Sequence, residues 1–161
     1  MKTFADPLTA MLAAFVRNAG IAVSAATLAE PTFLPGLDIR YGALEVDESR
    51  LTYPGDILHE AGHIAVADPA ERKQPKLSPN DGDEFAAIAW SYAAVIELGI
   101  DATVVFHPGG YRGWSAAYVE NFAAGRYVGV PLLQLYDMTI EPRWARGRSS
   151  EAYPRMQRWL R

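Results

Sequence analysis

The chain has 161 residues, half of them apolar and about a fifth charged, which predicts one compact domain spanning residues 1–161. Its net charge of −4 and pI near 5.3 give no reason to expect a nucleic acid or an anionic membrane as a partner. Cysteine is absent, so disulfides and thiolate metal ligands are excluded. Any metal site must therefore use His, Asp or Glu.

The N-terminal segment, Met1 to Ala29, superficially resembles a secretion signal, with an apolar stretch followed by small residues. Asp6-Pro7 in front of this stretch and Gly20 behind it are more typical of a capped helix. No run approaches the roughly 18 apolar residues that span a membrane. We therefore expect a mature, cytoplasmic protein.

The remaining pattern predicts a mainly helical α+β fold. Alternating apolar residues around Gly42 indicate two short strands or one bulged strand over 37–46. Thr103 to Phe106 is expected to be extended or a loop edge. A polar loop over 69–82 is long enough to act as a lid. Helical spacing bounded by proline and glycine predicts helices at about 7–19, 56–67, 83–98, 114–123, 131–137 and 151–160.

The C-terminal segment, 141–161, is basic in an otherwise acidic chain. Its six arginines and two glutamates give +4, which leaves −8 for the rest. A solvated face on a closing helix, anchored by Trp144, Trp159 and Leu160, is favoured over a contact with nucleic acid or lipid.

The sequence His59-Glu60-Ala61-Gly62-His63 lies in a stretch predicted to be helical and apolar nearly all round. Two histidines four residues apart on a helix differ by about 40° in azimuth and about 6 Å in height, so both can reach one ion. Glu60 is turned about 100° from His59, outside the ligand set. It can accept the proton of a water on the metal as a general base. The ordinary alternative is two core histidines satisfied by hydrogen bonds beside an incidental glutamate.

A catalytic zinc site needs a third protein ligand and one open position. Glu84 is our choice, because it begins the 83–98 helix 21 residues after His63 and the loop lets the chain turn back. Asp83 and Asp81, which are also the expected helix starts, are the nearest rivals, and His107 is the remaining histidine. As an alternative, Glu84 is a first-turn carboxylate favoured by the helix dipole.

The stretch from Tyr53 to Val66, followed by Glu84 on a helix, resembles the gluzincin type of zincin metallopeptidase. Among these it resembles the minimal ImmA/IrrE-like domains, over about residues 37–98. The resemblance implies a zincin-like domain with a small sheet beside the active helix, and Zn²⁺ held by His59, His63 and Glu84. Ile88 departs from the thermolysin-like pattern, so a supporting carboxylate is expected from Asp56 or elsewhere.

The metzincin pattern is excluded, because Val66 and Pro69 replace its glycine and third histidine. We expect the active helix to pack against the Glu84 helix, the N-terminal helix and the C-terminal helices.

The glycine-rich turn over 107–113 supplies the expected donors to an oxyanion: His107, Tyr111 and Arg112. An ordinary turn with one exposed histidine is an equal alternative. Tyr92 is expected to be a core residue rather than part of the site.

The expected activity is zinc-dependent hydrolysis of a peptide or protein, and a strand edge near 42–46 would hold the extended substrate. The alternatives are a zincin-like regulatory or binding module without peptidase activity, or a fold without metal. The ligand set also suits manganese, cobalt or iron.

Overall fold

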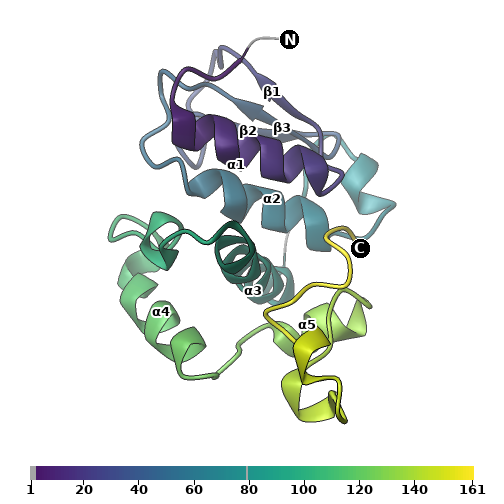
Figure 1. The fold of residues 1–161 in the computed structure, drawn as a ribbon. Helices are drawn as coiled ribbons and strands as arrows, with labels where there is room; N and C mark the ends of the chain where they lie inside the picture. Colours follow the sequence, from purple (N-terminus) through teal and green to yellow (C-terminus); the bar gives the residue numbers. More distant parts are fainter. Residues whose placement is uncertain (1–2, 79) are drawn as a thin grey trace.

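The computed structural model describes residues 3–78 and 80–161, and its fold is α+β and mainly helical, as predicted (Figure 1). The start of the signal-like segment and residue 79 of the predicted loop lie outside the described residues. The α-helices are α1 (Pro7–Asn18), α2 (Asp56–Val66), α3 (Asp81–Leu98), α4 (Ser115–Ala123) and α5 (Val130–Leu135). The strands are β1 (Val23–Ala25), β2 (Leu37–Arg40) and β3 (Ala43–Val46). Short 3-10 helices lie in the connections after α2, at Glu71–Lys73, Ala102–Val104, Tyr111–Gly113, Pro142–Trp144 and Ser149–Glu151.

Within the described residues, none of the helices combines the length and the apolar character needed to cross a bilayer. Helix α3 lies in the middle of the molecule, with the sheet, α1 and α2 toward one end and α4 and α5 toward the other (Figure 1). Helix α2 packs against α1, α3 and the sheet, whereas α5 packs against α3. The predicted packing of α2 against the Glu84 helix α3 and the N-terminal helix α1 is therefore confirmed. The C-terminal helix α5 packs against α3 rather than against α2.

The three strands form one small sheet with β3 in the middle, parallel to β1 and antiparallel to β2. Alternation places Val23, Leu44 and Ile39 in register on the face that packs against the helices. Two short strands over 37–46 are thus confirmed. The expectation of a free strand edge near 42–46 is wrong, because β3 is paired on both of its sides.

Helices α2 and α3 approach each other closely at Gly62. A Cβ atom at this position would lie 2.9 Å from the carbonyl oxygen of Ala87, so only glycine leaves room for the α3 backbone. The hydroxyl of Ser91 donates to the carbonyls of Leu58 at 3.3 Å and Ala87 at 2.7 Å, which joins the two helices at the same level. Small side chains on both helices therefore fix the spacing between α2 and α3.

Helix α3 begins at Asp81, and its N-cap is Asn80 rather than the expected Asp81 or Asp83. The side chain of Asn80 accepts from the backbone N–H of Asp83 at 2.9 Å, and Asp83 accepts from the N–H of Asn80 at 3.3 Å. Asp83 is therefore already used in the cap, which leaves Glu84 as the next acidic residue of the first turn.

The loop between α2 and α3 is tied to the end of α2 by Arg72. Its guanidinium donates to the carbonyls of Ile64 at 2.9 Å and Ala67 at 3.0 Å, and to that of Arg161 at 2.9 Å. The carbonyls of Ile64 and Ala67 lie at the end of α2, where a helix leaves its carbonyls unpaired. Arg72 thus links α2, the loop and the C-terminal segment.

The predicted helix at 151–160 is wrong. After Ser149–Glu151 the chain is irregular, and its N–H groups pair with distant carbonyls: Tyr153 with Ile140 at 2.8 Å, and Arg161 with Ala65 at 2.9 Å. The indole of Trp90 also donates to the carbonyl of Trp159 at 3.0 Å. Tertiary hydrogen bonds therefore replace the expected helical ones.

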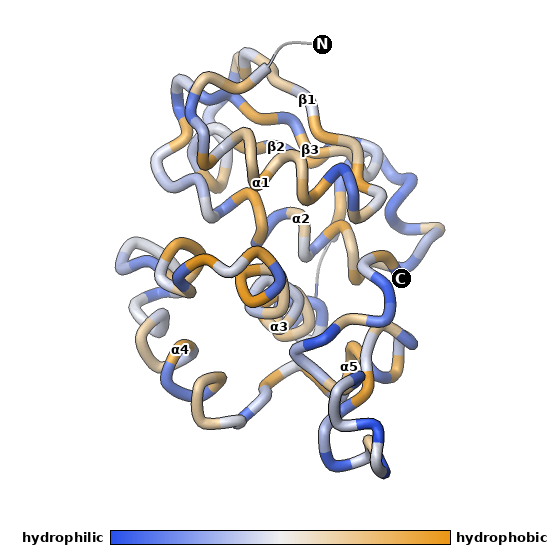
Figure 2. The backbone as a smooth tube through the Cα atoms, in the orientation of Figure 1, coloured by the Kyte–Doolittle hydropathy of each residue, from blue (hydrophilic) through white to orange (hydrophobic). Residues whose placement is uncertain are grey.

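The other C-terminal expectations are met in part. Trp159 packs edge-on against Trp90 and Leu160 lies against the core, whereas Trp144 is 50% exposed and anchors nothing. Figure 2 shows the hydrophilic character of the loop after α5, where several arginines lie on the surface. Thr103 to Phe106 is not extended, because Ala102–Val104 forms a 3-10 helix capped by Asp101.

Replacing Gly62 with alanine is expected to lower the free energy of unfolding by about 1–3 kcal/mol, because the added Cβ overpacks the α2–α3 contact. This loss is net of the gain of about 1 kcal/mol in helix propensity. Gly55→Ala should cost more, since its Cβ would lie 1.8 Å from the carbonyl oxygen of Val104. Urea titration measures both.

Ala14→Ser on the exposed side of α1 is the control and should stay within about 0.5 kcal/mol of the parent chain. A Gly62→Ala protein as stable as the parent would contradict the close approach of the two helices.

Candidate metal centre

Three side chains from two helices converge at the point where α2 crosses the first turn of α3. The Nε2 atoms of His59 and His63 lie 3.2 Å apart. Glu84 reaches both, with Oε2 at 3.0 Å from Nε2 of His63 and Oε1 at 3.6 Å from Nε2 of His59. The predicted helical geometry thus brings both imidazoles to one point, and α3 brings Glu84 to the same point.

These separations fit a tetrahedral metal ion. Ligand bonds of about 2.0–2.1 Å at tetrahedral angles place neighbouring ligand atoms about 3.3 Å apart. The two Nε2 atoms lie 3.2 Å apart, and each lies near that distance from one of the two oxygens of Glu84, at 3.0 Å for His63 and 3.6 Å for His59. Two imidazole nitrogens and one carboxylate form a donor set typical of zinc with one position left open.

The rival ligands lie elsewhere. Asp83 is held in the α3 cap, and Asp81 is exposed. His107 is buried and its Nε2 lies 2.7 Å from Oδ1 of Asp56. Among the residues that the structure describes, Glu84 is the carboxylate in ion-pair distance of His59 and His63.

Glu60 lies beside the two histidines, one residue after His59 on α2. Its carboxylate and the two imidazoles have ligand atoms within 4.8 Å of one another. Burial raises the pKa of Glu60 to about 7, although the nearby His63 works in the opposite direction. A carboxylate with a pKa near neutrality is suited to take up and release a proton at physiological pH.

The metal-ligand candidates have shifted pKa values of their own. Burial, and next the charge of His63, lowers the pKa of His59 to about 4, which favours its neutral form. Burial also works to lower the pKa of His63, but the contact with Glu84 and the charge of Glu60 raise it overall. Burial works to raise the pKa of Glu84, and its contacts with the two histidines lower it overall. His59 and Glu84 are therefore both in their metal-binding forms at neutral pH.

The glycine-rich turn lies against His59. The hydroxyl of Tyr111 is 3.1 Å from Nδ1 of His59, on the side of the ring away from Glu84. Burial raises the pKa of Tyr111 well above its ordinary value, so its hydroxyl stays neutral. The exposed Arg112 is close enough for its charge to help lower the pKa of Glu84. Tyr111 is thus brought against the back of His59 rather than toward Glu84, and the role of Tyr111 and Arg112 as oxyanion donors stays a prediction.

His107 is placed differently from the expectation. Its ring is buried, faces Asp56, and stacks on Tyr53 with centroids 3.7 Å apart and ring planes 10° from parallel. Asp56 therefore supports His107 rather than one of the histidines of the metal site. Sequence reasoning missed this pairing, although Asp56 and His107 both lie in segments that it singled out.

Tyr92 is a core residue, as expected. It stacks on Phe122 with centroids 4.6 Å apart and an interplanar angle of 16°.

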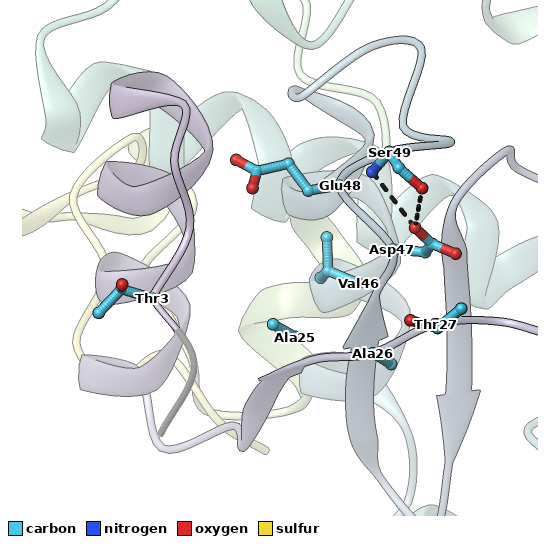
Figure 3. A pocket seen from close by; sticks show the side chains of 8 residues that line it. All are labelled: Thr3, Ala25, Ala26, Thr27, Val46, Asp47, Glu48 and Ser49. Carbon is cyan, nitrogen blue, oxygen red and sulfur yellow. Dashed lines mark hydrogen bonds between the residues drawn. The ribbon is translucent and has the colours of Figure 1, made fainter.

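Two hollows lie outside the cluster. One, of about 580 Å³, has mostly apolar walls and is formed by the segment around the glycine-rich turn and α4; its lining residues are Thr103, Phe106, Pro108, Gly113, Ser115, Ala116, Val119 and Glu120. The other, of about 470 Å³, lies at the ends of β1 and β3 (Figure 3).

The carboxylates of the second hollow are already used by the fold. Asp47 accepts from the N–H of Leu28 and from Ser49, and Glu48 accepts from the N–H groups of Ala5 and Asp6. These contacts tie the N-terminal segment and the β1–β2 connection to the end of β3.

No protein-family model, no curated protein and no solved structure matches this chain. The resemblance to zincin peptidases therefore depends on the residues of the motif and on the geometry of the cluster.

Glu84→Gln is expected to weaken zinc binding by more than about 100-fold, because losing a ligand exceeds the 10–100-fold typical of a supporting partner. His63→Gln should act in the same direction. Competition with a chromophoric chelator measures both affinities. Glu97→Gln, at the exposed far end of the same helix, is the matched control and should bind zinc like the parent chain. Equal affinities for Glu84→Gln and Glu97→Gln would remove Glu84 from the ligand set.

Proposed function

We propose that this protein is a zinc-dependent peptidase in which His59, His63 and Glu84 hold the metal and Glu60 is the general base. The observation that carries the proposal is the convergence of two imidazole nitrogens and one carboxylate group, from two different helices, with separations of 3.0 to 3.6 Å. An incidental pair of core histidines has no need of a third ligand from a separate helix at tetrahedral spacing.

The roles follow from where each side chain lies. His59 and His63 present Nε2 toward Glu84, so their Nδ1 atoms face away from the ion site. Zinc, when bound, supplies Lewis-acid chemistry and lowers the pKa of water toward 7. Glu60, one residue after His59, takes the proton from the attacking water. It then passes that proton to the leaving amine, for which its pKa of about 7 is well matched.

The zincin-like fold belongs to the same proposal. The small sheet beside α2, and α3 packed against α2, are consistent with such a domain. A peptide substrate is proposed from the resemblance of the motif rather than from the ion site itself, because the same zinc chemistry hydrolyses other bonds.

Glu60→Gln tests the proposal most directly. The change keeps the size of the side chain and leaves all three ligands in place, so zinc should bind with an affinity within a few-fold of the parent. The rate constant for peptide hydrolysis should fall by about 10²–10⁴-fold, which is the usual contribution of a general base. Elemental analysis of protein purified without chelator, and a panel of fluorogenic peptides, give the two measurements.

Two outcomes would overturn the proposal. The first is a chain that holds no stoichiometric zinc. The second is zinc retained without loss of hydrolysis in Glu60→Gln on any peptide of the panel. Zinc bound by a chain that cleaves none of the peptides would instead favour the regulatory or binding module. Glu97→Gln again serves as the control, because it removes a carboxylate that lies on the surface.

A further inference from the structure

The glycine-rich turn after residue 106 is more firmly held than an ordinary surface loop. His107, at its start, is 6% exposed and Asp56, in the first turn of α2, is 5% exposed. Nε2 of His107 lies 2.7 Å from Oδ1 of Asp56. Because α2 also carries His59 and His63, this contact ties the turn to the helix of the metal site.

We infer that Tyr111, held in place by the Asp56–His107 pair, is a positioning residue that fixes the ring of His59 for metal binding. The inference rests on the proposed zinc site, but it concerns the residues behind the ligands and not the hydrolytic step.

The two ring nitrogens of His59 face different neighbours. Nε2 faces His63 and Glu84, and Nδ1 lies 3.1 Å from the hydroxyl oxygen of Tyr111. When Nε2 offers its lone pair to a metal, Nδ1 carries the proton and donates it to the oxygen of Tyr111. Such an outer contact fixes both the tautomer and the rotation of the ring.

The backbone that presents Tyr111 has an uncommon conformation. Tyr111 and Arg112 have φ angles of 54° and 52°, in the left-handed region that residues other than glycine rarely adopt. Two consecutive residues in this region persist only where the surroundings hold them. Strained backbone of this kind is concentrated at functional sites.

The glycine-rich turn is held by contacts with Tyr53 and Ser115. The ring of His107 stacks on Tyr53, and the hydroxyl of Ser115 donates to the carbonyl of His107 at 2.6 Å. A Cβ on Gly109 would lie 2.8 Å from the ring of Tyr53, so the turn runs directly against it. Tyr111 therefore lies between two fixed points, His107 and Ser115.

His107 itself lies behind the site in this arrangement. Its Nε2 faces Asp56, while its Nδ1 is buried with no partner in the described part of the chain. The ring makes no hydrogen bond to His59 among the described residues and holds the turn that presents Tyr111, so His107 is a positioning residue as well.

Tyr111→Phe tests the inference with a small change, because the ring and its packing against Phe106 and Tyr118 remain. Zinc affinity should fall about 10–100-fold, as is typical when the outer partner of a ligand histidine is lost. In the zinc-loaded protein, the Nδ1 proton of His59 should also exchange faster with solvent by NMR. Tyr118→Phe, on the neighbouring ring, is the matched control and should leave both measurements unchanged.

His107 is tested by a pair of variants. His107→Gln keeps an N–H donor for Asp56 and should retain most of the zinc affinity, whereas His107→Leu should lose about as much as Tyr111→Phe. The losses of His107→Leu and Tyr111→Phe should not add in the double variant, because both act through the same contact. If His107→Leu does not fold, Tyr111→Phe and its control decide the matter alone.

The outcomes separate the inference from the proposed function. Zinc affinity of Tyr111→Phe within twofold of the parent chain, or equal to that of Tyr118→Phe, overturns the inference and leaves the function standing. The predicted losses in a chain that hydrolyses no peptide overturn the function and support the inference. A parent chain that takes up no zinc overturns both.

Discussion

The close contact between α2 and α3 is the constraint on which the candidate site depends. Glycine at position 62 lets the backbone of α3 approach at Ala87, one turn after Glu84. A wider spacing would carry Glu84 away from both imidazoles, because its side chain spans only a few ångströms. The small residue inside the motif is thus as important for the candidate site as the two histidines on either side of it.

Burial gives this arrangement its chemical character. Helix α2 is surrounded by α1, α3 and the sheet, so polar side chains on it lose much of their contact with water. Unpaired polar groups in such a place are costly, and charged ones more so. Burial therefore lowers the pKa of His59 and raises the pKa of Glu60, so that both neutral forms are favoured. The charged forms of His63 and Glu84 stabilise each other as a pair. A divalent cation would join these groups into one satisfied cluster.

The sequence predicted the parts of the fold in which local signals agree with one another. The helix around His59 has proline and glycine at its start and proline just after its end, and α3 ends at Gly99 in the left-handed conformation. The position of Glu84 could be predicted for the same reason, since a helix start fixes where its first carboxylates lie. These predictions needed no information about distant contacts.

The rest depended on distant contacts, which a local pattern does not contain. The segment after Ser149 has apolar and basic residues typical of a closing helix, but its N–H groups pair with Ile140, Met138 and Ala65. Strand β1 has only three residues and is defined by its pairing with β3. The Asp56–His107 pair spans 51 positions, so the sequence pattern treats the two residues separately, with Asp56 as a carboxylate supporting the metal site and His107 as a donor to the oxyanion.

Glu60 is the residue that best separates a catalytic site from a structural one. A site that only stores a metal ion has no use for a carboxylate beside the ligands, and burying that group raises its pKa to about 7 at a cost to the folded state. The nearby His63 offsets only part of this cost. Groups with strongly shifted pKa values and no structural partner are concentrated at active sites. The raised pKa of Glu60 is therefore one of the observations that support the proposed proton transfer.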